Sequence, residues 1–386
     1  MHRSGSSVRH QRVKRTSPGR RPLVAVGLAG AIGAATAWAG IPAAGAATGS
    51  PTPFLSHLSA VTNVASTVPA NGDVNPYGIT VVPQTVGHLV RGDTLVSNFN
   101  NSSNAQGTGT TIVEISPSGV VTPFAEIQRP AGTVGLTTAL TTLPGGWVVV
   151  GNLPTTDGTS ATASAGDLIV LNSVGQVVEE WSGHHINGPW DLTAVSNSSR
   201  SEIFVSNVLN GTVANSPEIV DGGTVVRLDV ALDRGEPPRL VGDTVIAKGF
   251  DERTDPNALV VGPTGLALGR DGELFVADTV NSRIAAVPDA LQRGTALPGG
   301  GLTVSSGGAL SGPLGLTLAP NGDVLTVNGG NGNIVETTVG GDQVAVAQID
   351  PAGAGGDLFG VALATHHRGV LFVDDGDNTV KLFGRT

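Results

Sequence analysis

Two adjacent histidines and one aspartate lie close together in the sequence and are the residues best suited to acid–base or metal chemistry. Asp191 follows Gly188-Pro189-Trp190, and His184 and His185 lie a few residues upstream. Imidazole and carboxylate side chains can bind a metal ion or move a proton. These three residues are therefore the candidate catalytic groups. The alternative is that the histidines are solvated on a surface loop and that Asp191 accepts hydrogen bonds from neighbouring backbone amides.

A second set consists of short polar residues, each of which ends an apolar run of strand length. Its members are Asn98, Asn152, Asn207, Asp278, Asn328 and Asp374. If these positions surround one axis, their oxygen atoms would suit a hard divalent cation such as calcium. The carboxylates that would bind this metal are Asp191, Asp278 and Asp374. The alternative is that the set caps tight turns, because Asn and Asp bond their own backbone and tolerate left-handed conformations.

A sequence motif that recurs along the chain predicts the strands that must position these residues. Its clearest copies are GPTGLALGRDGELFVADTVNSRIAAV, residues 262–287, and GPLGLTLAPNGDVLTVNGGNGNIVET, residues 312–337. Looser copies begin at Asn75, Gly132, Gly188 and Asp357. Each copy supplies short Val-, Ile- and Leu-rich runs separated by Asn-Gly, Asp-Gly or Gly-Gly pairs, which is typical of strands joined by tight turns. The pattern predicts an all-β fold, a six-bladed β-propeller with four-stranded blades.

The last copy is one strand short, and a spare segment near the N-terminus can complete it. The sixth copy ends at Phe383 after three strands, whereas a strand-like segment, residues 57–68, precedes the first copy. We expect this segment to pair beside residues 380–383, which would close the ring and cover the last sheet edge. The predicted organisation is a leader over residues 1–46, a flexible lead-in over 47–56 and the propeller over 57–386.

Strand alternation places the start of each first strand and the end of each second strand on one rim of the propeller. After the second strands, copies one to three carry long polar loops, residues 99–109, 153–165 and 208–222, whereas later copies have tight turns. Loops on a rigid scaffold often hold binding residues, so we expect a ligand site walled by these loops at the axial mouth. The alternative is that they are tolerated surface insertions. The predicted ligand-binding residues are Tyr77, Trp190, Asp191, Phe359, Asn98, Asn152 and Asn207.

The fourth copy resembles the NHL repeat. The resemblance is carried by Gly262-Pro263-x-Gly265-Leu266, Asp271-Gly272-x-Leu274-Phe275-Val276-Ala277-Asp278 and Asn281-x-Arg283-Ile284. More loosely, the chain resembles the senescence-marker/gluconolactonase and streptogramin-lyase propellers, the latter through Asn75-Pro76-Tyr77-Gly78-Ile79. The resemblance implies the fold, and one fold can host many functions. Gluconolactonase-type propellers hold a divalent cation with a Glu, an Asn and an Asp at first-strand starts, and only Asp191 matches such a position here.

The first 46 residues have the layout of a secretory signal peptide. Basic residues without an acid precede an apolar stretch over residues 23–41, and Ala44-Gly45-Ala46 then offers a cleavage site. Arg20-Arg21 resembles a twin-arginine signal, although Gly19 precedes the pair where Ser or Thr is usual. We expect export by the twin-arginine or the general secretory route. The mature protein would be secreted or lie on the exterior of the cell envelope, without a stable membrane span.

Removal of this leader would leave an acidic protein without cysteine. The whole chain has 21 Lys and Arg against 31 Asp and Glu, and the leader holds seven of the basic residues, so the mature net charge is about −17. This charge argues against nucleic acid and anionic lipid surfaces as partners. Because cysteine is absent, the chain can form neither disulfides nor a zinc–thiolate site.

These observations favour a secreted, monomeric propeller that binds a small molecule, glycan or envelope component on the rim walled by copies one to three. The ligand would be uncharged or cationic, because the protein is acidic. The first alternative is a metal-assisted hydrolase or lyase, lactonase-like or streptogramin-lyase-like, that acts at the channel mouth. The second alternative is a protein-interaction platform. The sequence contains no catalytic signature specific enough to name a reaction.

The leader generates a prediction about the export route. The mature N-terminus should be Ala47 or a neighbouring residue, as determined by N-terminal sequencing of the exported protein. Replacing both Arg20 and Arg21 with Lys should reduce the amount of exported protein on an immunoblot if the twin-arginine route is used. Unchanged export of this double variant would assign the general secretory route.

Overall fold

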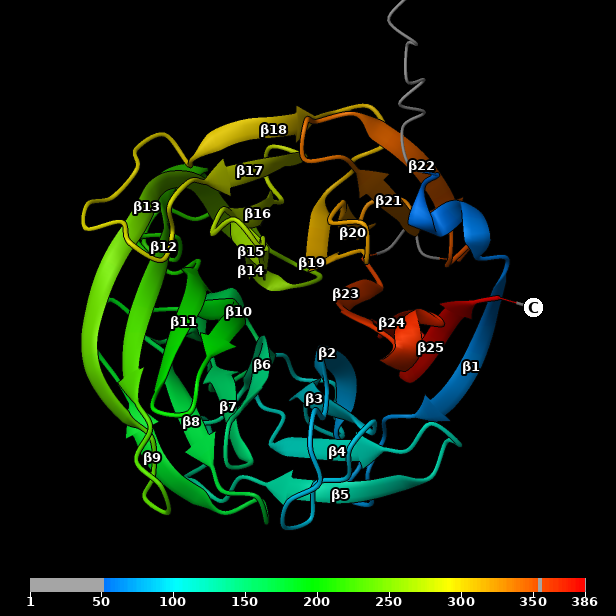
Figure 1. Ribbon diagram of the computed structural model, residues 1–386. Coiled ribbons are helices and arrows are strands. Elements are labelled where there is room, and N and C mark those ends of the chain that lie inside the picture. The colour runs from blue at the N-terminus through cyan, green and yellow to red at the C-terminus, as the bar shows by residue number, and fades with distance from the viewer. Residues whose placement is uncertain (1–51, 353–355, 386) are drawn as a thin grey trace, which may run out of the picture. The chain divides into compact units, whose positions relative to one another are not determined.

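Six β-sheets surround a common axis, and each has its strands in the order of a propeller blade (Figure 1). The computed structural model describes residues 52–352 and 356–385, so the predicted leader lies outside the described residues. Within the described part, the predicted six-bladed β-propeller with four-stranded antiparallel blades is confirmed.

Blades 1 to 3 follow the order of the chain. Blade 1 consists of β2 (Val74–Val81), β3 (Thr94–Asn100), β4 (Thr111–Ile115) and β5 (Val121–Glu126). Blade 2 consists of β6 (Leu136–Leu143), β7 (Trp147–Asn152), β8 (Asp167–Leu171) and β9 (Val177–Trp181). Blade 3 consists of β10 (Pro189–Ser196), β11 (Arg200–Asn207), β12 (Val220–Ala231) and β13 (Arg239–Asp255).

Blades 4 to 6 complete the ring. Blade 4 consists of β15 (Pro263–Leu268), β16 (Leu274–Asp278), β17 (Arg283–Val287) and β18 (Leu302–Ser306). Blade 5 consists of β19 (Pro313–Leu318), β20 (Val324–Asn328), β21 (Asn333–Thr337) and β22 (Gln343–Gln348). Blade 6 consists of β23 (Leu358–Leu363), β24 (Gly369–Asp374), β25 (Thr379–Gly384) and the N-terminal β1 (Ala60–Ser66).

The predicted closure by the N-terminal strand is confirmed. β1 pairs antiparallel with β25, with Ala60 opposite Gly384 and Ser66 opposite Thr379. The described helical segments are the short 3-10 turns η1 (Phe54–His57), η2 (Ser160–Thr162) and η3 (Thr365–His367). None of the described helices has the length and apolar character needed to cross a membrane.

The chain ahead of β1 is packed against the propeller at residues 54–56, which we had predicted to be part of a flexible lead-in. Phe54 and Leu55 are buried in the hydrophobic cluster between blades 5 and 6. Their backbone amides donate to the two carboxylate oxygens of buried Glu336, at 2.7 Å each. The propeller therefore begins at about residue 54, because this turn contributes both apolar contacts and hydrogen bonds to blade 5.

Close approach of the inner strands explains the glycine that recurs in every clear copy of the repeat. Gly265, Gly315 and Gly360 lie on β15, β19 and β23, the first strands of blades 4 to 6. A Cβ atom at these positions would overlap the carbonyl oxygens of Leu314, Phe359 and Tyr77, respectively, on the neighbouring inner strand. Only glycine, which has no side chain, allows the inner strands to approach this closely.

Hydrophobic clusters fill the spaces between the blades, and one interface differs from the rest. Each neighbouring pair from blades 1 and 2 through blades 5 and 6 has its own cluster of buried side chains. Blades 6 and 1 instead share the cluster around the axis, through Val373 and Val380 on one side and Val96 and Val113 on the other.

Blade 3 carries an extension that the repeat pattern did not predict. β13 runs beyond the end of its blade and pairs antiparallel with a fifth strand, β14 (Leu259–Val261). The hairpin between β13 and β14 reaches over the axis, on the rim where first strands begin.

The contact between Glu336 and η1 can be tested by mutation. Glu336→Ala should lower the free energy of unfolding by about 1–3 kcal/mol, because the amides of Phe54 and Leu55 would lose their acceptor in a buried site. Urea unfolding monitored by circular dichroism measures this loss. Asp342→Ala, which removes an exposed carboxylate from the same blade, is the control and should stay within about 0.5 kcal/mol of the parent. An equally small effect of both substitutions would contradict this role of Glu336.

Candidate functional site

An aromatic stack closes the axis at the rim where the first strands begin. The Tyr77 ring lies 3.8 Å from the Phe359 ring and 4.4 Å from the Phe99 ring, centroid to centroid, and both pairs are stacked. Trp190 lies 5.9 Å from Tyr77 and 6.3 Å from Phe359. The three predicted mouth residues therefore meet at one end of the axis. However, Tyr77, Trp190 and Phe359 are at most 1% exposed, so they do not line an open mouth.

The hairpin of blade 3 covers this stack. Residues 258–261 belong to the same buried cluster as the three aromatic side chains. The Tyr77 hydroxyl donates to the carbonyl oxygen of Asn257 at 3.4 Å. Leu259 adopts a left-handed conformation with φ of 63° and is 1% exposed, so the chain turns sharply to bury it. We call residues 255–261 the cover; the apolar run Ala258–Val261 ahead of Gly262 was its only signal in the sequence.

The long loops of blades 1 and 2 are bonded to each other and to the cover. The Thr155 backbone amide donates to the Gly107 carbonyl oxygen at 2.8 Å, and the Thr155 hydroxyl donates to the Gln106 carbonyl oxygen. The Gln106 side-chain amide in turn donates to the Pro256 carbonyl oxygen at 2.8 Å. The long loops raise one half of the rim, as predicted. These hydrogen bonds join the loops to each other and to the cover, so that together they cap the axis.

The loop of blade 3 is tied to the same extension by a buried carboxyl group. Glu252 Oε1 accepts hydrogen bonds from the Asn210 amide at 2.7 Å and the Thr212 hydroxyl at 2.8 Å. Burial raises the pKa of Glu252 to about 7, against the opposing effect of these two donors. The loop therefore depends on a carboxyl group that titrates near neutral pH.

A hollow of about 200 Å³ lies where the cover meets the low turns of blades 4 to 6. The cover side contributes Arg253, Asp255 and Asn257, with the guanidinium of Arg253 2.7 Å from the Asp255 carboxylate. The opposite side contributes Thr279, Leu314 and Phe359, together with the backbone of Gly329 and Gly330. The hollow thus combines an ion pair, apolar side chains and accessible backbone, which are the groups that small ligands use.

A group of acidic residues lies in blades 5 and 6, and one of them, Asp357, is between Gly356 and Phe359 of the hollow in the sequence. They are Asp350, Asp357, Asp374, Asp375 and Asp377, and Lys381 pairs with Asp374 and Asp377. The Asp375 backbone amide donates to the Asp357 carbonyl oxygen at 2.9 Å, which brings the two residues together. Burial, followed by the charges of Asp357 and Asp374, raises the pKa of Asp375 to about 8. Burial also raises the pKa of Asp357, because burial and nearby like charges disfavour ionisation of a carboxyl group.

Asp375 of this group and Asp255 of the cover also affect the pKa of Tyr77 in the aromatic stack. Burial, followed by the charges of Asp375 and Asp255, raises the pKa of Tyr77 well above its usual value. Asp375 and Asp357 were not among our predicted site residues. The signal that we missed was the adjacent pair Asp374-Asp375 directly after a buried strand.

Asp191 has a structural contact, as the alternative interpretation predicted. Its Oδ2 atom accepts a hydrogen bond from the Leu266 backbone amide on the neighbouring inner strand, at 2.9 Å. The side chain faces a small space on the axis beside Thr138, Gly315 and Gly360. Burial raises the pKa of Asp191 to about 7, opposed by the hydrogen bonds from Leu266 and Leu192.

His184 and His185 lie away from Asp191. Their Nδ1 atoms contact the two carboxylate oxygens of Asp243 on β13, at 2.8 and 2.6 Å. β13 is separated from β10, which carries Asp191, by two intervening strands, so about 14 Å of sheet lies between them. The predicted cluster of His184, His185 and Asp191 does not form. No group of three or more His, Asp or Glu residues suited to a metal occurs within residues 52–352 and 356–385.

The ring of short polar residues holds the chain that enters each blade. Asn98 Nδ2 donates to the Thr67 carbonyl oxygen at 3.0 Å, and Asn207 Oδ1 accepts from the Asn187 amide at 2.9 Å. The predicted metal ligands are paired with cations instead: Asp278 lies 2.6 Å from Arg283, and Asp374 lies 2.6 Å from Lys381. These contacts agree with the alternative interpretation of turn capping.

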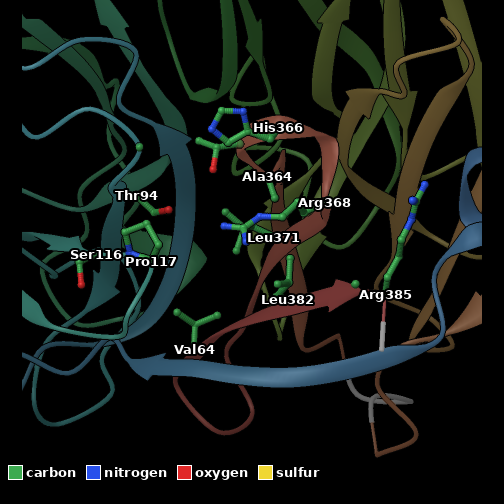
Figure 2. A pocket seen from close by; sticks show the side chains of 13 residues that line it. Val64, Thr94, Ser116, Pro117, Ala364, His366, Arg368, Leu371, Leu382 and Arg385 are labelled. Carbon is green, nitrogen blue, oxygen red and sulfur yellow. The ribbon is translucent and has the colours of Figure 1, made fainter.

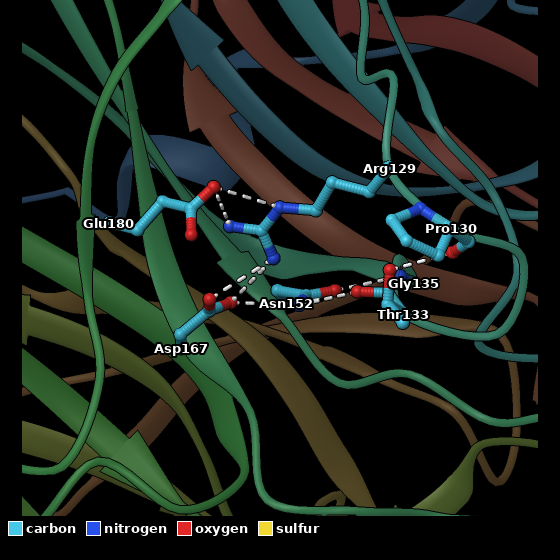
Figure 3. Close-up of polar contacts among 7 residues, drawn as sticks. All are labelled: Arg129, Pro130, Thr133, Gly135, Asn152, Asp167 and Glu180. Atoms are coloured by element: carbon cyan, nitrogen blue, oxygen red, sulfur yellow. Dashed lines mark hydrogen bonds and ion pairs between the residues drawn. The ribbon is translucent and has the colours of Figure 1, made fainter.

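Asn152 takes part in the largest of these polar networks (Figure 3). Its Oδ1 atom accepts from the Gly135 amide at 2.8 Å, and its Nδ2 atom donates to Asp167 at 2.7 Å. Arg129 lies between Asp167 and Glu180, at 3.1 and 2.7 Å (Figure 3). Since each charge in the network has a partner, it fixes the entry to blade 2.

Comparison with known proteins supports the fold. A family model of the NHL repeat matches residues 261–286. A gluconolactonase from Xanthomonas campestris shares 13% identity over 85% of this chain and 96% of that chain, with a TM-score of 0.52. A luciferin-regenerating enzyme shares 12% identity over 83% and 94%, with a TM-score of 0.50.

A virginiamycin B lyase from Staphylococcus aureus shares 16% identity over 83% of each chain, with a TM-score of 0.45. No curated protein sequence gave a significant match. The chain thus contains an NHL repeat within a six-bladed β-propeller, and at these identities the similar structures indicate the fold alone.

The buried carboxyl groups predict how stability depends on pH. Asp191, Glu252 and Asp375 have pKa values of about 7, 7 and 8 in the folded protein, whereas carboxyl groups of an unfolded chain titrate near about 4. Between these values the folded protein holds protons that the unfolded chain releases, so raising the pH favours unfolding. We expect the melting temperature, measured by calorimetry, to be higher at pH 5 than at pH 8.

Asp191→Asn tests the contribution of one of these groups. The asparagine oxygen can still accept the hydrogen bond from Leu266 but cannot ionise, so the drop in melting temperature between pH 5 and pH 8 should be smaller than in the parent. Asp271→Asn, at an exposed turn of blade 4, is the control and should show the full drop. An unchanged drop in Asp191→Asn would contradict the assignment.

Proposed function

We propose that this chain is an exported, monomeric propeller that binds a small uncharged or cationic ligand in the hollow between the cover and blades 4 to 6. The observation that carries the proposal is the hollow itself, a concavity of about 200 Å³ beside the closed axis. Its size suits one ring or one end group of a larger molecule, because sites for whole drug-sized ligands measure about 300–1,000 Å³. A glycan or another envelope component meets this description.

The chemistry of the hollow supports a saccharide as the first candidate. Arg253 and Asp255 provide a paired donor and acceptor, which can exchange hydrogen bonds with neighbouring hydroxyl groups of a sugar. Leu314 and Phe359 form the apolar floor at the other side of the hollow, and because they are 4% and 1% exposed, a sugar would contact only the small accessible part of these side chains. Phe359 is the one predicted ligand-binding residue that lines the hollow, whereas Tyr77 and Trp190 lie in the stack that supports it.

Charge supports the exclusion of anions. The aspartates of blades 5 and 6 outnumber Lys381, and in the lining of the hollow Asp255 is neutralised by Arg253. An anionic ligand would therefore be repelled, whereas a neutral or cationic ligand would not. Export is supported by the layout of the first 46 residues.

An enzymatic function is the second candidate, and the Asp357–Asp375 pair is the observation that favours it. Asp375, whose pKa is about 8, can donate a proton at neutral pH, and the neighbouring carboxyl group of Asp357 is the candidate acceptor. The metal-assisted hydrolase or lyase has less support, because His184, His185 and Asp191 do not converge. A protein-interaction platform remains the third candidate.

Ligand binding can be tested by calorimetric titration with neutral disaccharides such as maltose, cellobiose and chitobiose, and with spermidine as the cationic probe. Arg253→Ala should weaken saccharide binding at least about tenfold through the loss of a charged hydrogen-bond donor. It should strengthen spermidine binding, because Asp255 would lose its partner.

Arg239→Ala is the matched control, since Arg239 lies on the same strand and pairs with Asp233 at 3.0 Å. This variant should bind as the parent does, and both variants should keep the parent's melting temperature. No binding of either class of probe, or binding unaffected by Arg253→Ala, would contradict the proposed site.

A further inference from the structure

A cavity of about 640 Å³ lies on the opposite rim, between blades 6 and 1. It is lined by turns that follow first strands and by the ends of third strands, so it is remote from the hollow. It occurs at the one blade interface that has no hydrophobic cluster of its own. The shared cluster fills the part of this interface nearer the aromatic stack, with Val96, Val113, Val373 and Val380. The part nearer the opposite rim is left open.

One wall of this cavity is apolar. Leu371 and Leu382 are opposite one another in the register of β24 and β25, and Val64 lies at the bulge of the adjoining β1. All three side chains line the cavity and are only half-buried. Val64 and Leu371 pack against the shared cluster on one side, and all three side chains present a partly exposed apolar surface to the cavity.

The cavity is bounded on two sides by close contacts between the blades. At the outer side, Gly119 of the turn between β4 and β5 approaches Val64 so closely that a Cβ atom would lie 2.5 Å from the Val64 carbonyl oxygen. At the inner side, Gly92 lies next to the methyl group of Thr365. Blades 6 and 1 therefore contact each other at the outer side of the cavity and lie close together at its inner side.

The polar groups of the cavity are cationic. Its ionisable residues are His366, Arg368 and Arg385, and no Asp or Glu lines it. Figure 2 shows the Arg368 side chain extending across the cavity toward Thr94 and Pro117, with His366 above it and Arg385 set apart beyond Leu382. The nearest acid in the sequence of the blade 1 wall is Asp93, and burial is the cause of its raised pKa.

The guanidinium of Arg368 makes no hydrogen bond or ion pair with any described residue, as is also true of the exposed Arg270 and Arg385. Five other arginines are paired with carboxylates, namely Arg129, Arg227, Arg239, Arg253 and Arg283. A guanidinium offers donors in a planar fork that matches a carboxylate. Its position above the row of Val64, Leu371 and Leu382 combines one cation with an apolar surface.

We propose that this cavity binds an amphipathic monoanion, a carboxylate on an aliphatic or aromatic body. The carboxylate pairs with Arg368, assisted by the hydroxyl groups of Thr94 and Thr365, and the apolar body packs on Val64, Leu371 and Leu382. A single guanidinium reaches the middle of the cavity, which suits a monoanion better than a doubly charged phosphate. This site is separate from the hollow. It binds an anion, whereas the ligand that we propose for the hollow is uncharged or cationic.

Calorimetric titration of the purified protein with octanoate tests this site. Octanoate should bind, whereas acetate, which lacks the apolar body, and octanol, which lacks the charge, should bind at least about tenfold more weakly. Arg368→Ala should weaken octanoate binding by about tenfold or more, without changing the melting temperature, because the residue is exposed. Leu371→Trp should also abolish binding, since the larger side chain fills the apolar part of the cavity.

Arg270→Ala is the matched control. Arg270 is an exposed arginine at the equivalent turn of blade 4, between β15 and β16, so its loss changes the net charge of the same rim equally. This variant should bind octanoate as the parent does. Octanoate binding that is absent from the parent, equal to that of octanol, or weakened equally by Arg270→Ala and Arg368→Ala would overturn the proposal.

Discussion

The narrowness of the central axis is the constraint on which the rest of this propeller depends. Inner strands approach so closely that a Cβ atom at the repeated glycine would overlap the next strand. At the same place the register of most inner strands shifts, as between Pro76 and Ile79 on β2. The amide of Gly78 is then satisfied by the Ser97 hydroxyl, which in turn bonds the Thr137 carbonyl oxygen of blade 2. Steric exclusion and hydrogen bonding thus act together to join neighbouring blades.

An axis filled in this way leaves little room for chemistry inside the ring. Backbone occupies its middle, and the stack of Tyr77, Phe99, Trp190 and Phe359 closes one end. Asp191, the one acid among the repeated glycines, uses its carboxyl group to bond Leu266 of the next blade. Space for a ligand is therefore found on the two rims, and the two rims differ in charge: Asp255 lines the hollow and further aspartates lie in blades 5 and 6, whereas His366, Arg368 and Arg385 line the opposite cavity.

The sequence predicted the fold well because the repeat encodes local features, namely a glycine at a steric contact, apolar strands and short turns. Closure by β1 was predictable because the sixth copy lacks a strand. The site was harder to predict, because it depends on departures from the repeat. The cover arises from an extension of β13 that has no counterpart in other blades, and it buries the aromatic residues that we had placed at an open mouth. The contact between Asp357 and Asp375 joins two strands of blade 6, and the spacing of these residues in the sequence does not reveal it.

The pairing of β1 with β25 also constrains the order in which the parts of the protein can fold. The first strand of the propeller to be synthesised pairs with the last. The hydrogen bond from the Phe54 amide to Glu336 can form only after Glu336, 282 residues later in the chain, has been synthesised. Until the C-terminal strands exist, an incomplete ring exposes unpaired sheet edges, and contacts of such long sequence separation form slowly. The ring therefore closes late, after all six blades have been synthesised. A chain still attached to the ribosome is an open arc with exposed sheet edges.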